Sequence, residues 1–530
     1  MKTRVPAILS FLSFSGLASG ALAQDFDGDG YADLAVGSPY EDGAYANCGV
    51  VHVLYGGTGG LSGSGSQVFD QSVPGLGDSP EANDMFGYSL AWGDVNGDGC
   101  DDLAIGVPFE DVSIDHSKTV VADAGVVHVL FGGPGGLSAS GALRYTEANY
   151  SPFELEAGDR FGYSVCIGQF IRNNDRKADL AVGAPRDGVN GAPAAGAVFV
   201  FPSPEDSGAS AQIWTQGNSL AGTTSEAYDQ FGSALAYGSL PNHDYLAIGV
   251  PDEDLGTSCP DAGAVVVIYC SSSWGALSAA DAQLWWQSGY SVPDAAEAYD
   301  RFGASLATGF FSDPLQGSDL AIGVPGEDLG TSINAGAVCV LYHTDIGGPS
   351  RLTANGAEFW TQDSWGVPDV AEAGDGFGGA LAVGRFNAGQ QDLAVGVPGE
   401  DLGGVIDAGA VHVIYGGSGG LAGAGSQFWT QDTSGVLDAA EARDQFGFAL
   451  VGADFDGDQH DDLAVSVPYE DFSSGTWSRG VADAGAVSVL YSRSGMPSFT
   501  GNQFWTQDSA DIQDANETSD CFGFGRCGNP

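Results

Sequence analysis

Three short acidic segments of this chain carry oxygen-bearing side chains at the same spacing, at positions 1, 3, 5 and 9 of a nine-residue loop. The side chains are Asp25, Asp27, Asp29 and Asp33 in the first, Asp94, Asn96, Asp98 and Asp102 in the second, and Asp454, Asp456, Asp458 and Asp462 in the third. Calcium takes six to eight oxygen ligands from carboxylates, carbonyls and water. Carboxylates held this close repel one another unless a cation lies between them. The spacing therefore predicts about three calcium sites.

The elements that must position these loops are short β-strands. The second loop follows a run that begins at Phe86-Gly87 and leads into the run Leu103 to Gly106. Two strand-like runs joined by a tight Gly/Asp/Asn loop predict a β-hairpin.

The same hairpin returns along the chain. Seven strands of the type Leu-Ala-x-Gly/Ser-x-Pro begin at Leu34, Leu103, Leu180, Leu246, Leu320, Leu393 and Leu463. Seven Phe-Gly pairs begin at Phe86, Phe161, Phe231, Phe302, Phe377, Phe446 and Phe522. Each returning strand is followed by a second kind of loop, which contains a Glu-Asp pair in six of the seven units. An apolar strand comes next, and then a fourth run that contains an aromatic residue. Each unit thus contains four short strands, and no convincing amphipathic helix is present.

This repeat predicts an all-β fold, a seven-bladed β-propeller of four-stranded blades. A single four-stranded sheet exposes too much edge and apolar face to be stable alone, and radial repetition covers both. The chain from residue 24 begins at an acidic loop without a preceding Phe-Gly strand, whereas Phe522 to Gly528 is a Phe-Gly strand without a following loop. We therefore expect the C-terminal strand to join the N-terminal blade and close the ring.

These motifs resemble the FG-GAP repeats of the seven-bladed propeller at the head of integrin α chains. The resemblance covers Gln24 to Pro530 and depends on the Phe-Gly pairs, the DxDxDGxxD loops and the Leu-Ala-x-Gly-x-Pro strands. It implies that the position-7 carbonyls of Tyr31, Cys100 and His460 add a calcium ligand, and that the propeller serves adhesion or recognition. We expect the chain to depart from an integrin in lacking a stalk, a membrane span and a cytoplasmic tail.

Only three of the seven loops keep the acidic pattern. The other four, at 169–179, 239–244, 310–319 and 385–392, have too few carboxylates or carry basic residues. In the last acidic loop Gln459 replaces the usual glycine, which predicts a strained turn. Because blades seven, one and two are neighbours in a closed ring, the predicted ions flank the junction of the chain ends and are expected to stabilise its closure.

Composition restricts the class of partner. The chain has 69 acidic and 16 basic residues, a net charge of -53, so we expect no binding of nucleic acid by charge. Residues 1–23 are predicted to be a secretory signal peptide: Lys2 and Arg4 precede an apolar run that ends near Leu17, and Ala21-Leu22-Ala23 is a cleavage signal. The apolar run is too short to cross a membrane. We expect residues 24–530 to be exported, to the periplasm or the extracellular space, as one propeller and a monomer without membrane insertion.

Eight cysteines fit an oxidising compartment, and Cys48 with Cys521 is the one disulfide that we predict. No CxxC pair indicates zinc.

The remaining polar and aromatic patterns recur in every unit, which favours structural roles. A Glu-x-x-Asp pair precedes each Phe-Gly and is predicted to bond loop amides, on the face opposite the acidic loops. The fourth-strand aromatics are predicted to pack between blades, and the equivalent residues His52, His128 and His412 are predicted to be packing residues rather than ligands. Less regular aromatics, Trp274, Trp365 and Trp477, are better candidates for a ligand surface.

These observations favour a secreted calcium-binding module that recognises a protein. A calcium-dependent, lectin-like carbohydrate-binding propeller is the alternative. An enzyme, such as a polysaccharide lyase or hydrolase, is the third interpretation, because no set of nucleophile and base stands out from the repeat.

Overall fold

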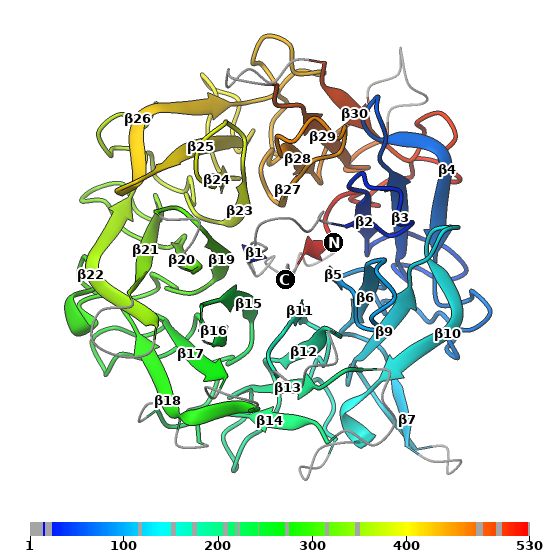
Figure 1. Cartoon of the computed structure of the whole chain (residues 1–530), viewed down its shortest axis with the longest axis horizontal. Coiled ribbons are helices and arrows are strands. Elements are labelled where there is room, and N and C mark those ends of the chain that lie inside the picture. The colour runs from blue at the N-terminus through cyan, green and yellow to red at the C-terminus, as the bar shows by residue number, and fades with distance from the viewer. Residues whose placement is uncertain are drawn as a thin grey trace, which may run out of the picture.

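A computed structural model describes residues 14–15, 24–114, 119–149, 155–171, 177–204, 210–217, 220, 223–241, 243–270, 275–312, 317–344, 350–472, 481–493 and 501–527. Its sheets are arranged around one central axis (Figure 1). The prediction of an all-β, seven-bladed propeller is confirmed.

Each blade is an antiparallel sheet whose strands follow one another from the axis outward. Blade 1 contains β2 (Leu34–Ser38), β3 (Val50–Tyr55) and β4 (Ser62–Phe69). Blade 2 contains β5 (Ser89–Gly93), β6 (Asp102–Val107), β9 (Val126–Phe131) and β10 (Ser138–Tyr145). Blade 3 contains β11 (Ser164–Gly168), β12 (Asp179–Ala184), β13 (Ala197–Phe201) and β14 (Gln212–Trp214). Blade 4 contains β15 (Ala234–Ser239), β16 (Asp244–Val250), β17 (Ala264–Cys270) and β18 (Leu277–Trp285).

The remaining blades repeat this order. Blade 5 contains β19 (Ser305–Gly309), β20 (Asp319–Val324), β21 (Ala337–Thr344) and β22 (Arg351–Trp360). Blade 6 contains β23 (Ala380–Gly384), β24 (Asp392–Val397), β25 (Ala410–Gly417) and β26 (Gly420–Trp429). Blade 7 contains β27 (Leu450–Ala453), β28 (Asp462–Val467), β29 (Ala486–Leu490) and β30 (Gln503–Trp505). Outside the blades are the hairpin β7 (Val112–Ile114) and β8 (Thr119–Val121), two short 3-10 turns, η2 (Glu147–Asn149) and η3 (Gly289–Ser291), and β1 (Phe14–Ser15), which pairs in parallel with β19.

The second strand of each blade is buried on both faces, which explains its run of small apolar residues. In blade 2, all six residues of β6 are buried. A Cβ atom on Gly106 would lie 2.1 Å from the carbonyl oxygen of Gly162 in the next blade. The glycine of the Leu-Ala-x-Gly motif is therefore required here by the close approach of neighbouring backbones.

The aromatic residues of the repeat form the contacts between blades. Every phenylalanine of the seven Phe-Gly pairs is fully buried. Tyr145 of blade 2, for example, packs against Phe201 of blade 3 with ring centroids 4.7 Å apart. Most of the fourth-strand aromatics are also buried, namely Phe69, Tyr145, Trp214, Trp285 and Trp429. Their predicted packing role is confirmed, as is that of His52, His128 and His412, which are all buried.

The C-terminal segment lies against the inner edge of blade 1. The amide of Gly523 donates to the carbonyl oxygen of Gly37 at 3.1 Å, as that of Gly162 does to Gly183 within blade 3. This contact fits the predicted closure. The sheet of blade 1 itself contains three strands, because the segment continues as β31 (Arg526–Cys527), which pairs in parallel with β5 of blade 2.

The predicted disulfide is wrong. Cys48 and Cys521 are each buried as free thiols, and burial raises the pKa of the Cys521 thiol well above its ordinary value. Within the described part of the chain, no helix has the length and apolar character needed to cross a membrane. Most of the predicted signal peptide, and Trp274 and Trp477, lie outside the described residues.

Candidate metal centres

The three acidic loops lie side by side in the order seven, one, two, on the face formed by the connections between first and second strands. The amide of Ala32 in loop one donates to the carbonyl oxygen of Asp454 in loop seven at 3.1 Å, and the amide of Asp101 in loop two donates to that of Asp25 at 2.9 Å. Similar bonds link loop three to loop two and loop seven to loop six. A band of backbone hydrogen bonds thus joins successive loops.

Side chains at position 8 reinforce this band at some junctions. The carboxylate of Asp101 accepts from the amide of Asp25 at 3.2 Å, and that of Asp461 accepts from the amide of Arg385 at 2.6 Å. Position 8 of loop one is Ala32, which has no acceptor. We call the backbone bond and the position-8 side-chain bond between two loops a clasp. Between blades 7 and 1 the clasp consists of the backbone bond alone.

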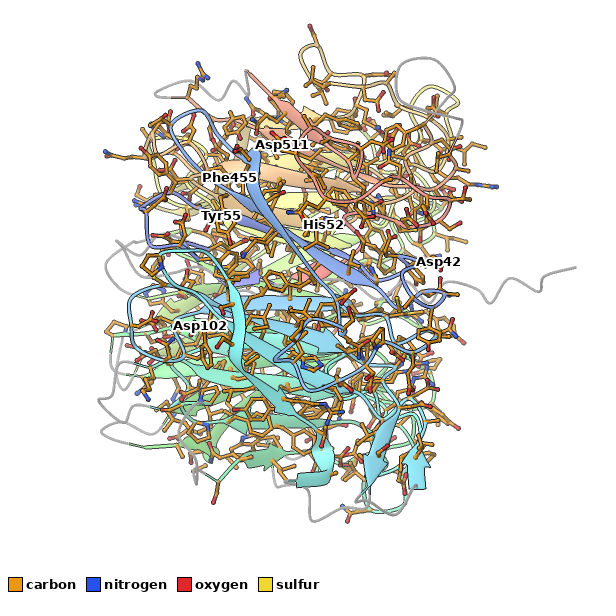
Figure 2. The ribbon with its side chains drawn as sticks, turned by 90° about the vertical axis from the view of Figure 1, so that its right-hand side faces the viewer. Asp42, His52, Tyr55, Asp102, Phe455 and Asp511 are labelled. Atoms are coloured by element: carbon orange, nitrogen blue, oxygen red, sulfur yellow. The ribbon has the colours of Figure 1, made fainter. Side chains whose placement is uncertain are left out.

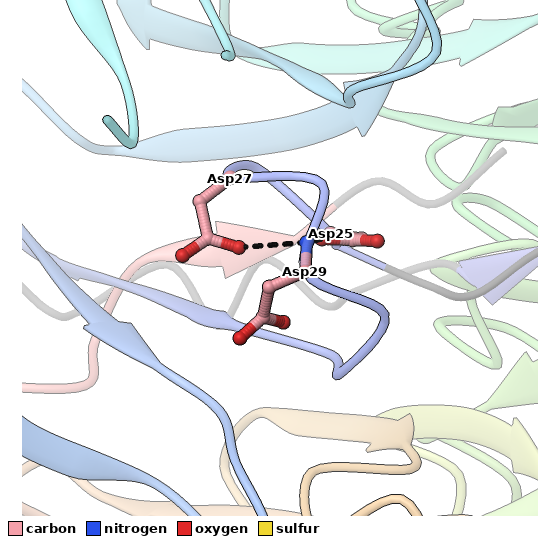
Figure 3. A group of neighbouring side chains, drawn as sticks. All are labelled: Asp25, Asp27 and Asp29. Carbon is pink, nitrogen blue, oxygen red and sulfur yellow. Dashed lines mark hydrogen bonds between the residues drawn. The ribbon is translucent and has the colours of Figure 1, made fainter. Parts of the chain in front are cut away.

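Loop one brings its first three aspartates together around the turn. Ligand oxygens of Asp25, Asp27 and Asp29 all lie within 4.8 Å of one another. The amide of Asp29 donates to Asp27 Oδ1 at 3.0 Å and to Asp25 Oδ1 at 3.1 Å, which fixes both carboxylates (Figure 3). Gly28 and Gly30 have positive φ angles of 74° and 96°, as this tight turn requires.

Loops two and seven have the same local geometry. The amide of Asp98 donates to Asp94 Oδ1 and Asn96 Oδ1 at 3.1 and 2.8 Å, and the amide of Asp458 donates to Asp454 Oδ1 and Asp456 Oδ1 at 3.0 and 3.2 Å. In loop seven, oxygens of Asp454, Asp456 and Asp462 lie within 4.8 Å of one another.

Gln459 has a φ angle of 73° in loop seven. This left-handed conformation confirms the predicted strain at a position where the other two loops have glycine.

The position-9 aspartates have a structural role that does not depend on metal. Asp33 accepts from the amides of Phe26 and Gly56 at 2.8 and 2.9 Å. Asp102 and Asp462 make the matching bonds, and so do Asp179, Asp319 and Asp392 in loops that lack the acidic set. The carboxylate and amide side chains at positions 1, 3 and 5 are therefore what distinguishes the candidate metal loops.

Burial and mutual repulsion disfavour the charged state of these loops without a cation. Burial raises the pKa of Asp33 and Asp102 to about 8 and that of Asp462 to about 9. The pKa values of Asp25, Asp94 and Asp454 are also raised, chiefly by burial and in part by neighbouring carboxylates. A divalent ion would remove this penalty. The donor set, with carboxylates at every position but Asn96, fits a hard cation such as calcium.

Comparison with known proteins points to the same three loops. A family described as FG-GAP repeat matches residues 17–54, 86–130 and 446–490, and each match contains one acidic loop. The chain carries FG-GAP repeats. The resemblance to integrin α propellers is thereby confirmed at the level of the repeat and the fold.

Curated relatives share these FG-GAP repeats over part of their length. Phosphatidylinositol-glycan-specific phospholipase D of Rattus norvegicus is 30% identical over 229 residues, which are 43% of this chain and 24% of the relative. Integrin alpha-PS2 of Drosophila melanogaster is 34% identical over 179 residues, 33% of this chain and 11% of the relative. Integrin alpha-PS5 of the same organism is 41% identical over 85 residues, 16% of this chain and 8% of the relative. The chain spans about a quarter or less of the length of these relatives.

The opposite face is formed by the connections between second and third strands and between successive blades. The side view places Asp102 and Phe455 of the FG-GAP loops at one face and Asp42 at the other (Figure 2). Here the Glu-x-x-Asp pairs have the predicted role, since the aspartate accepts from the amide of the glutamate in every blade.

Sequence reasoning missed a concentration of exposed apolar side chains on this second face. In the part of the chain that the structure describes, ten large apolar residues are exposed, and all belong to the connections of this face: Tyr45, Val120, Tyr228, Tyr290, Tyr299, Ile333, Trp365, Val370, Ile406 and Leu437. Trp365, predicted as a ligand-surface residue, is the most exposed at 84%. The signal available in the sequence was that these residues interrupt the repeat at polar loop positions.

Proposed function

We propose that this chain is a secreted, calcium-stabilised FG-GAP propeller that recognises a protein partner through the face opposite its metal loops. The observation that carries the proposal is that, among the described residues, the exposed large apolar side chains all belong to connections on that face. Soluble proteins rarely expose contiguous apolar patches without an interaction role.

The exposed residues are densest over blades 4 to 6. Tyr290, Tyr299, Ile333, Trp365 and Val370 come from the connections of these blades and are between 56% and 84% exposed. Aromatic residues are enriched in the cores of protein interfaces and among their energetic hot spots. The chain is strongly acidic, so a partner with basic residues around an apolar centre would be complementary to this surface.

Calcium has a structural role in this proposal. The FG-GAP loops lie on the other face and flank the junction of blades 7, 1 and 2, so ions bound there would act on ring closure and not directly on the partner. The relatives named as integrins support a recognition role, and the predicted signal peptide supports export. Free calcium at extracellular levels would keep the loops filled.

The test is capture of extracellular proteins by purified residues 24–530 in calcium and in EGTA, compared with Trp365→Ala and Tyr299→Ala. Because both side chains are exposed, the variants should keep the melting temperature of the parent and lose most of the captured partner. Thr58→Ala, an exposed residue on the metal face, is the matched control and should capture as the parent does. Equal capture by all variants would contradict the assignment of this face.

A second candidate function, glycan binding, is favoured by one groove. A groove of about 620 Å³ lies between β18 and β22 and is lined by Trp285, Tyr290, Ser291, Thr353 and Asn355 among others. Aromatic rings beside hydroxyl and amide groups can stack against and hydrogen-bond to a sugar. Binding to a glycan array that requires calcium and is lost in Tyr290→Ala would support this candidate over protein recognition.

A further inference from the structure

A buried glutamine–glutamate hydrogen bond joins neighbouring blades on the face opposite the FG-GAP loops. The glutamine follows the fourth strand of one blade, and the glutamate follows the second strand of the next. At the junction of blades 6 and 7, Gln431 Nε2 donates to Glu470 Oε2 at 2.7 Å. The bond occurs at six junctions, with the pairs Gln71–Glu110, Gln216–Glu253, Gln287–Glu327, Gln362–Glu400, Gln431–Glu470 and Gln507–Glu41.

The junction of blades 2 and 3 departs from this pattern at both positions. Glu147 stands where the other junctions have glutamine, and Asp187 stands where they have glutamate. The first change replaces an amide donor by a third carboxylate. The second shortens the facing side chain by one methylene group, which leaves more room between the two.

The result is a cluster of three buried carboxyl groups. Oxygens of Glu147, Asp159 and Asp187 all lie within 4.8 Å of one another, and the three residues are 0%, 1% and 1% exposed. Asp159 Oδ2 accepts from the amide of Glu156 at 2.7 Å. Neither oxygen of Asp187 has a hydrogen-bond partner among the described residues.

Such a cluster is costly unless something replaces the missing donor. A buried carboxylate without a partner loses its hydration and gains nothing in return, and nearby carboxylates add repulsion. A cation coordinated by all three groups would satisfy Asp187 and cancel most of the charge. Oxygen-only, anionic ligands at this spacing suit a hard divalent ion.

We propose that Glu147, Asp159 and Asp187 form a separate calcium site that bridges blades 2 and 3. The site uses no FG-GAP loop and lies on the opposite face of the propeller. At this one junction the ion takes the place of the glutamine amide that bridges the blades elsewhere.

The experiment compares Glu147→Gln with the parent chain. Residues 24–530 are saturated with calcium, passed through a metal-free desalting column and measured for calcium per chain by mass spectrometry of the metal. Glu147→Gln restores the amide donor of the other six junctions, so it should fold normally and retain one calcium fewer. Asp187→Asn should show the same loss.

The matched control is Glu156→Gln, an exposed acid next to the cluster, which should retain the parental number of ions. In EGTA, Glu147→Gln should melt at or above the temperature of the parent, because it removes an uncompensated charge. Equal calcium content in the parent, Glu147→Gln and Asp187→Asn would overturn the proposal and show that the three groups share protons. This outcome is distinguishable from failure of the FG-GAP loops, since Asp94→Asn tests those loops independently.

Discussion

Blades 7, 1 and 2 differ from blades 4, 5 and 6 on both faces of the propeller. The first group carries the three acidic FG-GAP loops, and its blade 1 has a sheet of only three strands. The second group has complete four-stranded sheets, loops without the acidic set, and most of the exposed apolar side chains of the opposite face. Both groups keep an aspartate at the end of the loop that accepts one bond from an amide within the loop and one from an amide near the end of the third strand, as Asp462 and Asp392 illustrate. The same hairpin therefore forms in loops without the acidic set, and oxygen-bearing side chains at positions 1, 3 and 5 occur together only in the closing blade and its two neighbours.

Removal of calcium should have the largest effect. An ion present at 100 times its dissociation constant stabilises the folded chain by about 2.7 kcal/mol per site. Three such sites should raise the melting temperature by about 10 °C or more. Differential scanning calorimetry in calcium and in EGTA measures the shift. A change in melting temperature below about 2 °C would contradict the proposal that calcium stabilises the chain through the loops of blades 7, 1 and 2.

Replacing Trp429 and Trp365 by alanine should show, from the loss in unfolding free energy, which tryptophan packs between blades and which belongs to the surface. Trp429 is 8% exposed and Trp365 is 84% exposed. Trp429→Ala should cost about 3–5 kcal/mol of unfolding free energy, because it leaves a cavity between blades. Trp365→Ala should change it by no more than about 0.5 kcal/mol. Urea titration of both variants measures the costs, and a large loss for Trp365→Ala would argue that it packs rather than binds.

Single loop substitutions should separate ion binding from turn structure. Asp454→Asn should lower the melting temperature in calcium, by the equivalent of about 2 kcal/mol, and have little effect in EGTA. Asp392→Asn, at the end of a loop without the acidic set, should lower the melting temperature equally in both buffers, because it weakens bonds to Asn387 and Gly416. If Asp392→Asn also responded to calcium, the distinction between acidic and non-acidic loops would fail.

The pH dependence should be a smaller effect shared by both groups. Burial raises the folded-state pKa of Glu400 to about 9, far above its ordinary value of 4.5. Folding therefore favours the protonated acid, so this contribution is complete below about pH 4.5 and is lost as pH rises toward 9. The carboxylates of Asp369 and Asp375 face Glu400 and add to the shift, while the amide of Gln362 opposes it. Melting temperature in EGTA should fall between pH 5 and pH 9, and less steeply in Glu400→Gln than in the exposed control Glu372→Gln. Identical slopes of melting temperature against pH in the two variants would show that Glu400 does not contribute to the pH dependence.

Repetition is what made the fold predictable from the sequence. Seven copies of one strand and seven Phe-Gly pairs define the number of blades, and the unmatched Phe522 places the C-terminal segment beside the first blade. The three acidic loops could also be recognised from the sequence, because their candidate ligands are close in sequence and share one spacing; that they bind calcium stays a prediction.

The features that could not be predicted are of two kinds. Some are contacts between residues distant in sequence, and others are second roles of residues that the motif had already assigned to metal binding. Gln362 and Glu400 are 38 residues apart, so their bond becomes visible only when two blades are placed side by side. The second role of Asp33, as an acceptor for Gly56, was hidden behind its place in the metal motif. Cys48 and Cys521 are both buried as free thiols, and the sequence contains no signal for the direction in which either thiol points.

The clasp between blades 7 and 1 has a mechanical consequence. Tension applied between Gln24 and Gly525 would load the contacts Gly523–Gly37 and Ala32–Asp454, and Ala32 offers no side-chain acceptor to reinforce the second of them. The ring of blades would open at the junction between blades 7 and 1 while the individual sheets stayed intact. In single-molecule pulling, a first rupture whose force rises with calcium concentration would be the signature of this behaviour.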